Sequence, residues 1–323
     1  MGSIRRVRAV IVAWNSQDHL PRCLAAIAAT AWDGDLEVVV VDNGSTDGTT
    51  DAWSRRYPGV ELRETGANLG FAAAANRGLT DLDGVDAVAL VNPDAFVEPG
   101  WLVPLANALE DDGRIGAACP KILFAEPGPR GEAIINNAGN ELSSRWEPRD
   151  RGYGEPDRGQ YDEPEDVWGW CGGAALLRRE YLQDVGRFDE RLFMYAEDAD
   201  LSWRGARRGW RYRYVPASVV HHVRGASSGG ERTPMLDYLN RRNRLVVVSR
   251  HGGVRGAVSA WTRAVGGLVV AAVAATGRSL LRRPADWGGV RRRAVAASHA
   301  ARLLATGRVP ASAPLPPAAA ARP

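Results

Sequence analysis

Short apolar segments alternate with helical segments over residues 7–91, and this alternation constrains the fold more than any other feature of the chain. Residues 7–14 are rich in β-branched side chains, and residues 36–41 are almost wholly apolar, which is typical of a strand covered on both faces. The pattern predicts strands at 7–14, 36–41, 60–64 and 86–91, and helices at 20–28, 50–57 and 71–79. We therefore expect an α/β fold with a mostly parallel central sheet flanked by helices.

Ligands of such sheets collect at the carboxyl ends of the strands, so the loops to search follow Val12, Val41 and Val91. Asp42 follows the second strand, where a carboxylate can accept hydrogen bonds from a nucleobase edge. A plain turn is the alternative, since Asp, Asn, Gly and Ser dominate turns for local reasons. Asp94 follows a later strand and could bind Mg²⁺ or Mn²⁺, which typically take one or two carboxylates plus substrate phosphates.

The second half of the region predicts a less regular arrangement. Residues 125–165 are rich in Gly, Pro and charge and read as a long excursion with a hairpin near 134–142, typical of a lid or an acceptor-binding element. We expect a strand at 174–177, helices at 179–185 and 198–208, and a strand at 210–215. The core should close near His222.

Acidic residues at 197–200 open the helix that is expected at 198–208. Such acids also cap helices, so a purely structural role is a real alternative. Their position between Gly172 and the pair His221 and His222 favours chemistry, and Asp198 is placed to take a proton from an attacking hydroxyl. Neighbours in a strand point to opposite faces, so at most one of the two histidines should face the site.

Composition excludes several classes of protein. The chain has 323 residues, of which 45% are hydrophobic and 24% charged, so neither general disorder nor a polytopic membrane protein is indicated. Its 41 basic residues include a single lysine, Lys121, which is typical of a GC-rich, actinobacterial-like genome. Acidic residues crowd 30–200 whereas 203–308 is strongly basic, and this asymmetry predicts an anionic partner such as phosphate or lipid head groups rather than nucleic acid.

The three cysteines are odd in number and widely separated, which argues against a disulfide framework or a zinc site. The N-terminal residues contain no apolar leader segment. Both features predict a cytoplasmic location.

The region 236–308 is helical, basic and alanine-rich, and 309–323 predicts a disordered Ala/Pro tail. Residues 264–276 form an apolar stretch that we expect to be too short to span a bilayer by about five residues or more. Two readings stay open: an interfacial helix held on the inner face of the plasma membrane by anionic lipid, or a helix packed on the catalytic domain. The flanking arginines are Arg278, Arg282, Arg283, Arg291, Arg292 and Arg293.

Taken together, these segments resemble family 2 glycosyltransferases of the GT-A fold, especially the rhamnosyltransferase-like branch, over roughly residues 7–250. The motifs stand in the family's order: Ala13-Trp14-Asn15-Ser16, Asp42-Asn43-Gly44-Ser45, Asn68-Leu69-Gly70, Asn92-Pro93-Asp94, Gly172-Gly173, Glu197-Asp198-Ala199-Asp200, His222 ahead of Gly225 and Ser227, and Tyr238 with Arg242 and Asn243. Asn92-Pro93-Asp94 replaces the usual Asp-x-Asp, so a single carboxylate remains and His222 gains importance. Trp14 stands where Tyr is frequent.

The resemblance implies a role for each matching residue. Asp198 would be the catalytic base, and Asp94 with His222 would hold Mg²⁺ or Mn²⁺. The acceptor side would consist of Trp170, Glu197 and Asp200. The donor would contact Ala13, Trp14, Asn15, Asp42, Asn43, Asn68, Gly70, Asn92, Asp94, Gly172 and Arg242.

The implied enzyme is a metal-dependent, inverting glycosyltransferase of cell-wall or polysaccharide biosynthesis. It would move a sugar, rhamnose by analogy, from a dTDP- or UDP-linked donor to a hydroxyl of a glycan, lipid-linked or small-molecule acceptor. Residues 1–235 would be the catalytic domain, with a donor half at 1–120 and an acceptor half at 121–235, and a homodimer is left open.

Two other classes remain open from the sequence. A sugar nucleotidyltransferase normally has a Gly-rich, basic loop after its first strand, which residues 13–17 lack. A non-catalytic carbohydrate- or lipid-binding protein would be expected to have lost Asp94 or Asp198, and both are present.

Overall fold

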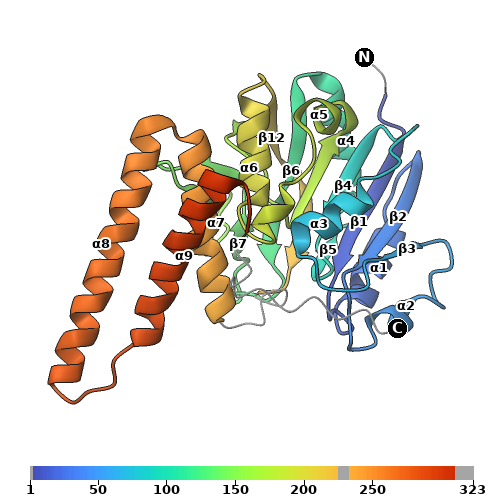
Figure 1. Ribbon diagram of the computed structural model, residues 1–323. Helices are drawn as coiled ribbons and strands as arrows, with labels where there is room; N and C mark the ends of the chain where they lie inside the picture. The colour runs from blue at the N-terminus through green and yellow to red at the C-terminus, as the bar shows by residue number, and fades with distance from the viewer. Residues whose placement is uncertain (1–2, 225–232, 310–323) are drawn as a thin grey trace.

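The computed structural model describes residues 3–224 and 233–309, and its centre is a ten-stranded sheet (Figure 1). The strand order is β10-β12-β6-β11-β4-β1-β2-β3, with β5 on β12 and β7 on β6. The strands are β1 (Arg6–Ala13), β2 (Asp35–Asp42), β3 (Glu61–Glu64), β4 (Ala87–Val91), β5 (Ala95–Val97), β6 (Ile115–Phe124), β7 (Ile135–Asn137), β10 (Glu165–Val167), β11 (Ala174–Arg178) and β12 (Arg211–His222).

Helices cover both faces of this sheet. They are α1 (Leu20–Ala28), α2 (Thr49–Trp53), α3 (Phe71–Gly78), α4 (Leu102–Asp111), α5 (Arg179–Val185) and α6 (Glu197–Ala206). In β1, Val7, Ala9 and Ile11 share a core with α1 and α4, whereas Val10 shares a core with α3, α5 and α6. Strands buried on both sides need apolar residues at every position, which explains their unbroken apolar runs.

The predicted parallel arrangement is confirmed for β3-β2-β1-β4 and for β12 with β6. β11 lies between β4 and β6 and is antiparallel to both, so the sheet is mixed. Sequence periodicity indicates a strand but not its direction. β6 was not predicted at all, because Gly116, Pro120 and Lys121 interrupt its apolar pattern although all ten of its residues are buried.

The long excursion forms a small β-unit beside the sheet. The predicted hairpin at 134–142 is wrong: β7 pairs with β6, and the hairpin consists of β8 (Asn140–Leu142) and β9 (Pro148–Asp150). Gly139, at φ +88°, separates the two segments, so the chain turns away from β6 before the hairpin begins.

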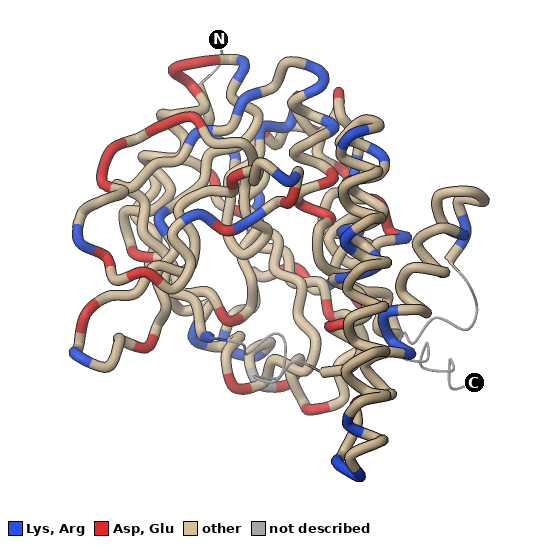
Figure 2. Tube along the Cα trace, turned by 90° about the vertical axis from the view of Figure 1, so that its left-hand side faces the viewer, with Lys and Arg blue, Asp and Glu red and all other residues tan. Residues whose placement is uncertain are grey.

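Three helices follow the sheet: α7 (Pro234–His251), α8 (Gly253–Leu280) and α9 (Trp287–Thr306). α7 packs on α6 and on the turn before it through a cluster that includes Trp203 and Leu192. α8 and α9 lie side by side and project away from the sheet (Figure 1). Basic residues recur along these helices and at the far end of the pair (Figure 2).

The expectation that the apolar segment is too short to span a bilayer is wrong for the helix that contains it. α8 has 28 residues, more than the roughly 20 that a bilayer requires. Among the described residues it is the one helix that is long and apolar enough to cross a membrane, by length and composition alone. Only 6% of its most apolar 18-residue segment is buried. The Gly225 and Ser227 motif and all but the first residue of the predicted tail lie outside the described residues.

Candidate active site

A cavity of about 410 Å³ opens at the carboxyl ends of β1, β2 and β4, between α6, the β8–β9 hairpin and α7. This is the sheet edge where the sequence predicted a site. Nine of the proposed site residues line it: Trp14, Asn43, Asn68, Gly70, Asn92, Gly172, Glu197, Asp198 and His222.

The loop after β2 is fastened to the loop before α3 by two asparagines. The Asn43 side chain donates to Asn68 Oδ1 at 3.1 Å and accepts from the Leu69 amide at 2.9 Å, and Asn68 Oδ1 also accepts from the Gly70 amide at 2.9 Å. Gly70 has φ +83°, and a Cβ there would lie 2.5 Å from the Phe193 ring. Glycine is therefore required where this loop meets the wall of the cavity.

Asp42 ends β2 beside this fastening and is 6% exposed. Its Oδ2 accepts from the Ser45 amide at 3.3 Å, and its buried Oδ1 has no hydrogen-bond partner among the described residues. An unsatisfied buried acceptor is costly unless a ligand donates to it. Trp14 lies at the cavity with 42% of its surface exposed.

Ala13 and Asn15, two further proposed donor contacts, do not line the cavity. The Ala13 carbonyl accepts from the Asn43 amide at 2.7 Å, and Asn15 Oδ1 accepts from the Thr46 amide at 2.9 Å. Both residues therefore shape the loops after β1 and β2 through hydrogen bonds.

Asp94 and His222 lie together beside the same cavity. Pairing of β12 with β5 sets His222 opposite Ala95, and His222 Nε2 lies 3.1 Å from Asp94 Oδ1. His221 points elsewhere, with its Nε2 at 3.1 Å from Glu98 Oε1. Asp94 is 2% exposed, and His222 rather than Asp94 lines the cavity.

This pair fits a divalent cation whose remaining ligands come from a bound substrate. No group of three His, Cys, Asp or Glu side chains that could hold a metal occurs in the described part of the chain. Mg²⁺ and Mn²⁺ are commonly held by one or two protein ligands plus phosphate oxygens, whereas a structural ion needs a full set of protein ligands. One carboxylate and one imidazole are therefore suited to an ion that arrives with a diphosphate.

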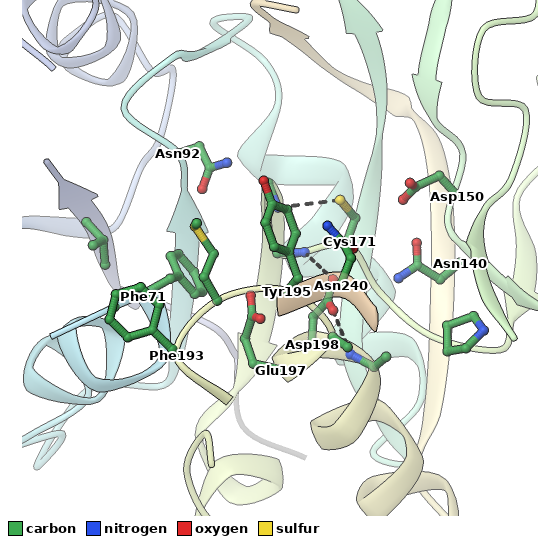
Figure 3. A pocket seen from close by; sticks show the side chains of 18 of the residues that line it. Phe71, Asn92, Asn140, Asp150, Cys171, Phe193, Tyr195, Glu197, Asp198 and Asn240 are labelled. Atoms are coloured by element: carbon green, nitrogen blue, oxygen red, sulfur yellow. Dashed lines mark hydrogen bonds between the residues drawn. The ribbon is translucent and has the colours of Figure 1, made fainter. Parts of the chain in front are cut away.

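Asp198 faces the cavity from the first turn of α6 (Figure 3). Its Oδ2 accepts from the Gly172 amide at 3.0 Å and its Oδ1 from the Ala199 amide at 2.7 Å. Burial raises the pKa of Asp198 although both hydrogen bonds oppose the rise. Burial also raises the pKa of Glu197, with a further contribution from the charge of Asp198, so the two carboxyls do not ionise independently.

The segment before α6 is strained. Phe193, Tyr195 and Ala196 all have positive φ, at 69°, 72° and 64°. Such conformations cost about 1–3 kcal/mol each and persist where surrounding structure holds them. Asn243 Nδ2 on α7 lies within 2.9 Å of the carbonyl oxygens of Leu192, Met194 and Tyr195, so α7 fixes the segment that carries Asp198.

Comparison with known families agrees with this geometry. The model of glycosyl transferase family 2 matches residues 9–186, which is more than half of the chain. The chain belongs to this family. It is a glycosyltransferase with a GT-A fold.

Two relatives of this glycosyltransferase align with it over most of their own length. It is 34% identical to the N-acetylglucosaminyl-diphospho-decaprenol L-rhamnosyltransferase of Mycobacterium tuberculosis over 269 residues, which is 78% of this chain and 87% of the relative. It is 28% identical to the succinoglycan biosynthesis protein ExoU of Rhizobium meliloti over 259 residues, 74% of this chain and 68% of the relative.

Solved structures share the fold. The mannosyltransferase PcManGT of Pyrobaculum calidifontis, in complex with GDP-Man and Mn²⁺, is 19% identical with a TM-score of 0.52, over 94% of this chain and 88% of its own. GalNAc-T7 with UDP, GalNAc and Mn²⁺ is 18% identical with a TM-score of 0.60, over 76% of this chain and 48% of its own. The glycosyltransferase thus spans about half the length of GalNAc-T7.

The structure does not place Arg242 at the cavity, contrary to the expectation that it meets the donor diphosphate. Arg242 is fully buried, and its guanidinium donates to the carbonyls of Leu192 at 2.8 Å and Arg191 at 3.0 Å. Together with Asn243 it holds the strained segment of the glycosyltransferase. The motif match identified Arg242 as a residue of the family pattern, but it did not reveal that the side chain is buried.

The expectation that Trp170 and Asp200 lie on the acceptor side is also wrong. Trp170 is fully buried, and its indole Nε1 lies 3.4 Å from the Tyr181 hydroxyl. Asp200 is paired with Arg204 and with His251, each at 2.8 Å. Burial alone would raise the pKa of Asp200, but the hydrogen bond from His251 and the charge of Arg204 bring it below its ordinary value.

Asp150 is a cavity residue that sequence reasoning missed. It ends β9 and lines the same cavity as Asn92, and Tyr195 and Cys171 lie between the two in the view of Figure 3. Asn137 Nδ2 donates to Asp150 Oδ1 at 2.8 Å, and burial raises the pKa of Asp150. The composition of its loop predicted an acceptor-binding element but could not single out one of the many acids there.

Proposed function

We propose that this glycosyltransferase transfers a sugar, with inversion, from a dTDP- or UDP-sugar to a hydroxyl of a lipid-linked glycan. One observation carries the proposal: a single cavity is lined both by Asp198 and by His222, whose Nε2 lies 3.1 Å from Asp94 Oδ1. The mycobacterial relative is named as a rhamnosyltransferase for N-acetylglucosaminyl-diphospho-decaprenol, which supports rhamnose as the sugar and a polyprenyl diphosphate as the anchor of the acceptor.

Asp198 acts as the base. Its carboxylate takes the proton of the acceptor hydroxyl as that oxygen attacks the anomeric carbon and the bond to the donor diphosphate breaks. A single displacement inverts the configuration at that carbon. Burial raises the pKa of Asp198 to about 6, which makes the carboxylate a stronger base than an exposed aspartate. Above that pH the carboxyl group is mostly ionised and can accept a proton.

The donor nucleoside binds at the loops after β1 and β2. The unsatisfied Oδ1 of Asp42 accepts a hydrogen bond from the nucleobase, and the exposed ring of Trp14 offers a stacking surface. Asp94 and His222 would hold Mg²⁺ or Mn²⁺. When bound, such an ion supplies charge stabilisation for the departing nucleoside diphosphate.

The matched pair His222 and His221 tests the metal site. With a dTDP- or UDP-sugar donor and a soluble diphospholipid-linked acceptor, His222→Ala should lose most of the Mn²⁺ stimulation of transfer. His221→Ala should keep it, because that side chain lies against Glu98. Wild-type activity unchanged by EDTA, or equal loss in both variants, would remove the metal from the proposal.

Contact with an anionic membrane, on the inner face of the plasma membrane, completes the proposed function. The outer face of α8 presents Val258, Val265, Val269 and Val273, each more than half exposed, and the helix carries no charged residue from Ala264 to Gly277. Exposed arginines follow at its far end: Arg278, Arg282 and Arg283. Apolar side chains enter the lipid while arginines meet anionic head groups, as in interfacial helices.

Vesicle flotation tests this contact. The wild type should float with phosphatidylglycerol vesicles and much less with phosphatidylcholine vesicles, and Val265→Glu with Val269→Glu should abolish flotation. Val103→Glu, an equivalent change at an exposed position of α4, should leave flotation intact. Equal flotation of all variants would contradict the assignment to α8.

A further inference from the structure

A second cavity of about 420 Å³ lies between α7, α8 and α9, outside the catalytic cavity. Each of the three helices contributes arginine to it: Arg241 and Arg244 from α7, Arg263 from α8 and Arg293 from α9. Two carboxylates also line it, Glu147 and Asp237. Four arginines against two acids leave a formal charge of +2, so this groove, which we call the arginine groove, attracts anions.

Two of the four guanidinium groups, those of Arg244 and Arg293, make no close ion pair in the described part of the chain. Arg241 pairs with Asp237 at 2.8 Å and Arg263 with Glu147 at 3.2 Å. Arg244 is 51% exposed along its side chain and stands 3.9 Å from Glu147, and Arg293 has no ion pair within 4 Å in the described part of the chain. Arg244 and Arg293 can therefore turn toward an incoming anion without breaking a close ion pair.

Small residues keep the groove open. Ala260 and Ala264 on α8 and Ala296 on α9 line it opposite Leu236 and Leu245 of α7, and Ala260 and Ala296 are buried. Longer aliphatic side chains at these positions would fill the space and pack the three helices together, as a purely structural interface requires. The combination of alanine walls and excess arginine is instead suited to a hydrated, anionic ligand.

The arginine groove adjoins the catalytic cavity. Asn240 and Arg244 line both, and they stand one helical turn apart on the same face of α7. A ligand can therefore extend from the cavity that holds Asp198 to the groove without leaving the surface of α7. An acceptor whose reacting hydroxyl lies in the cavity would carry its next anionic group to Arg244.

We propose that the arginine groove binds the diphosphate of a polyprenyl diphosphate-linked acceptor, with Arg244 and Arg293 as its principal ligands. This inference rests on the proposed function and adds to it the place where the acceptor's anchor is recognised. Arginine suits this task, since its planar guanidinium donates two parallel hydrogen bonds to phosphate oxygens.

Binding of farnesyl diphosphate tests the groove without requiring turnover. Titrations at about physiological salt, with the donor site saturated by dTDP and Mn²⁺, should show binding to the wild type. Arg244→Ala and Arg293→Ala should each weaken it roughly tenfold or more, about 1.4 kcal/mol. Arg302→Ala, at an exposed position of α9 outside the groove, should not change it.

Three further arms separate the sources of the effect. Farnesol should not bind, and phosphatidylglycerol below its aggregation concentration should bind no more weakly to the two variants than to the wild type. In transfer assays, KM should rise in the variants for a diphosphate-linked acceptor and stay constant for an alkyl glycoside of the same sugar. Equal farnesyl diphosphate affinity in all proteins would overturn the inference, whereas an inactive wild type that still binds it would overturn only the proposed function.

Discussion

Replacing Asp198 by asparagine should abolish catalysis while leaving the fold intact. The carboxylate accepts from the amides of Gly172 and Ala199, and an asparagine can satisfy only one of them with its single oxygen. Losing one acceptor costs about 1–3 kcal/mol of stability. Removing a buried charge whose pKa is already raised offsets part of that cost, so the net change in unfolding free energy should stay within about 2 kcal/mol.

The catalytic loss should be far larger than this change in stability. A general base typically contributes about 10²–10⁴-fold to the rate, so kcat of Asp198→Asn should fall by that factor. Donor affinity should survive, since the donor loops follow β1 and β2 whereas Asp198 belongs to α6. Asp83→Asn, the same change at an exposed position on the loop before β4, is the matched control.

The pH dependence provides a second readout. The base must be deprotonated, and burial raises its pKa, so wild-type kcat/KM should fall on acidification at a pH above the ordinary aspartate value of about 3.9. The assay is transfer from a radiolabelled nucleotide sugar, with donor affinity measured by calorimetry. A kcat for Asp198→Asn within threefold of wild type would refute the assignment of the base.

Three other variants test the surrounding structure. Burial raises the pKa of Glu197, so ionisation of this carboxyl destabilises the folded state once the pH exceeds the ordinary glutamate pKa. The melting temperature of Glu197→Gln minus that of the wild type should therefore increase from about pH 4 to pH 8. Gly70→Ala should cost about 1–3 kcal/mol more than Gly66→Ala in urea unfolding, because both have positive φ but only Gly70 would place its Cβ against Phe193. Arg242→Ala should lower the free energy of unfolding by about 2–5 kcal/mol, because two carbonyls before α6 lose their hydrogen-bond donor. The affinity for dTDP should be retained at low temperature. A selective loss of dTDP affinity would instead support a donor-binding role for Arg242.

Local sequence determined much of the fold and of the donor side of the cavity. Apolar runs identify β1, β2 and β4 because strands buried on both faces need them, and the residues that follow these strands must then meet at one edge. Asn43 and Asn92 were found in this way. Strand alternation likewise indicated that at most one of the two adjacent histidines faces the site, and the family resemblance selected His222 over His221.

Other features depended on tertiary contacts that no local pattern reveals. The direction of β11 follows from its neighbours, and the burial of Arg242 follows from the packing of α7 on the segment before α6. Asp150 reaches the cavity only because β8 and β9 form a hairpin beside it. In α8 the uncharged segment is shorter than the helix, so counting apolar residues underestimated its length.

The central claim is that the donor diphosphate binds at Asp94 and His222, facing Asp198 across one cavity. A crystal structure with Mn²⁺ and dTDP or UDP, with the metal located by anomalous scattering, tests it most directly. We expect one metal peak bound by the Asp94 carboxylate, His222 Nε2 and diphosphate oxygens, with the nucleobase at Asp42. A metal bound elsewhere, or a diphosphate outside the cavity that contains Asp198, would contradict the account.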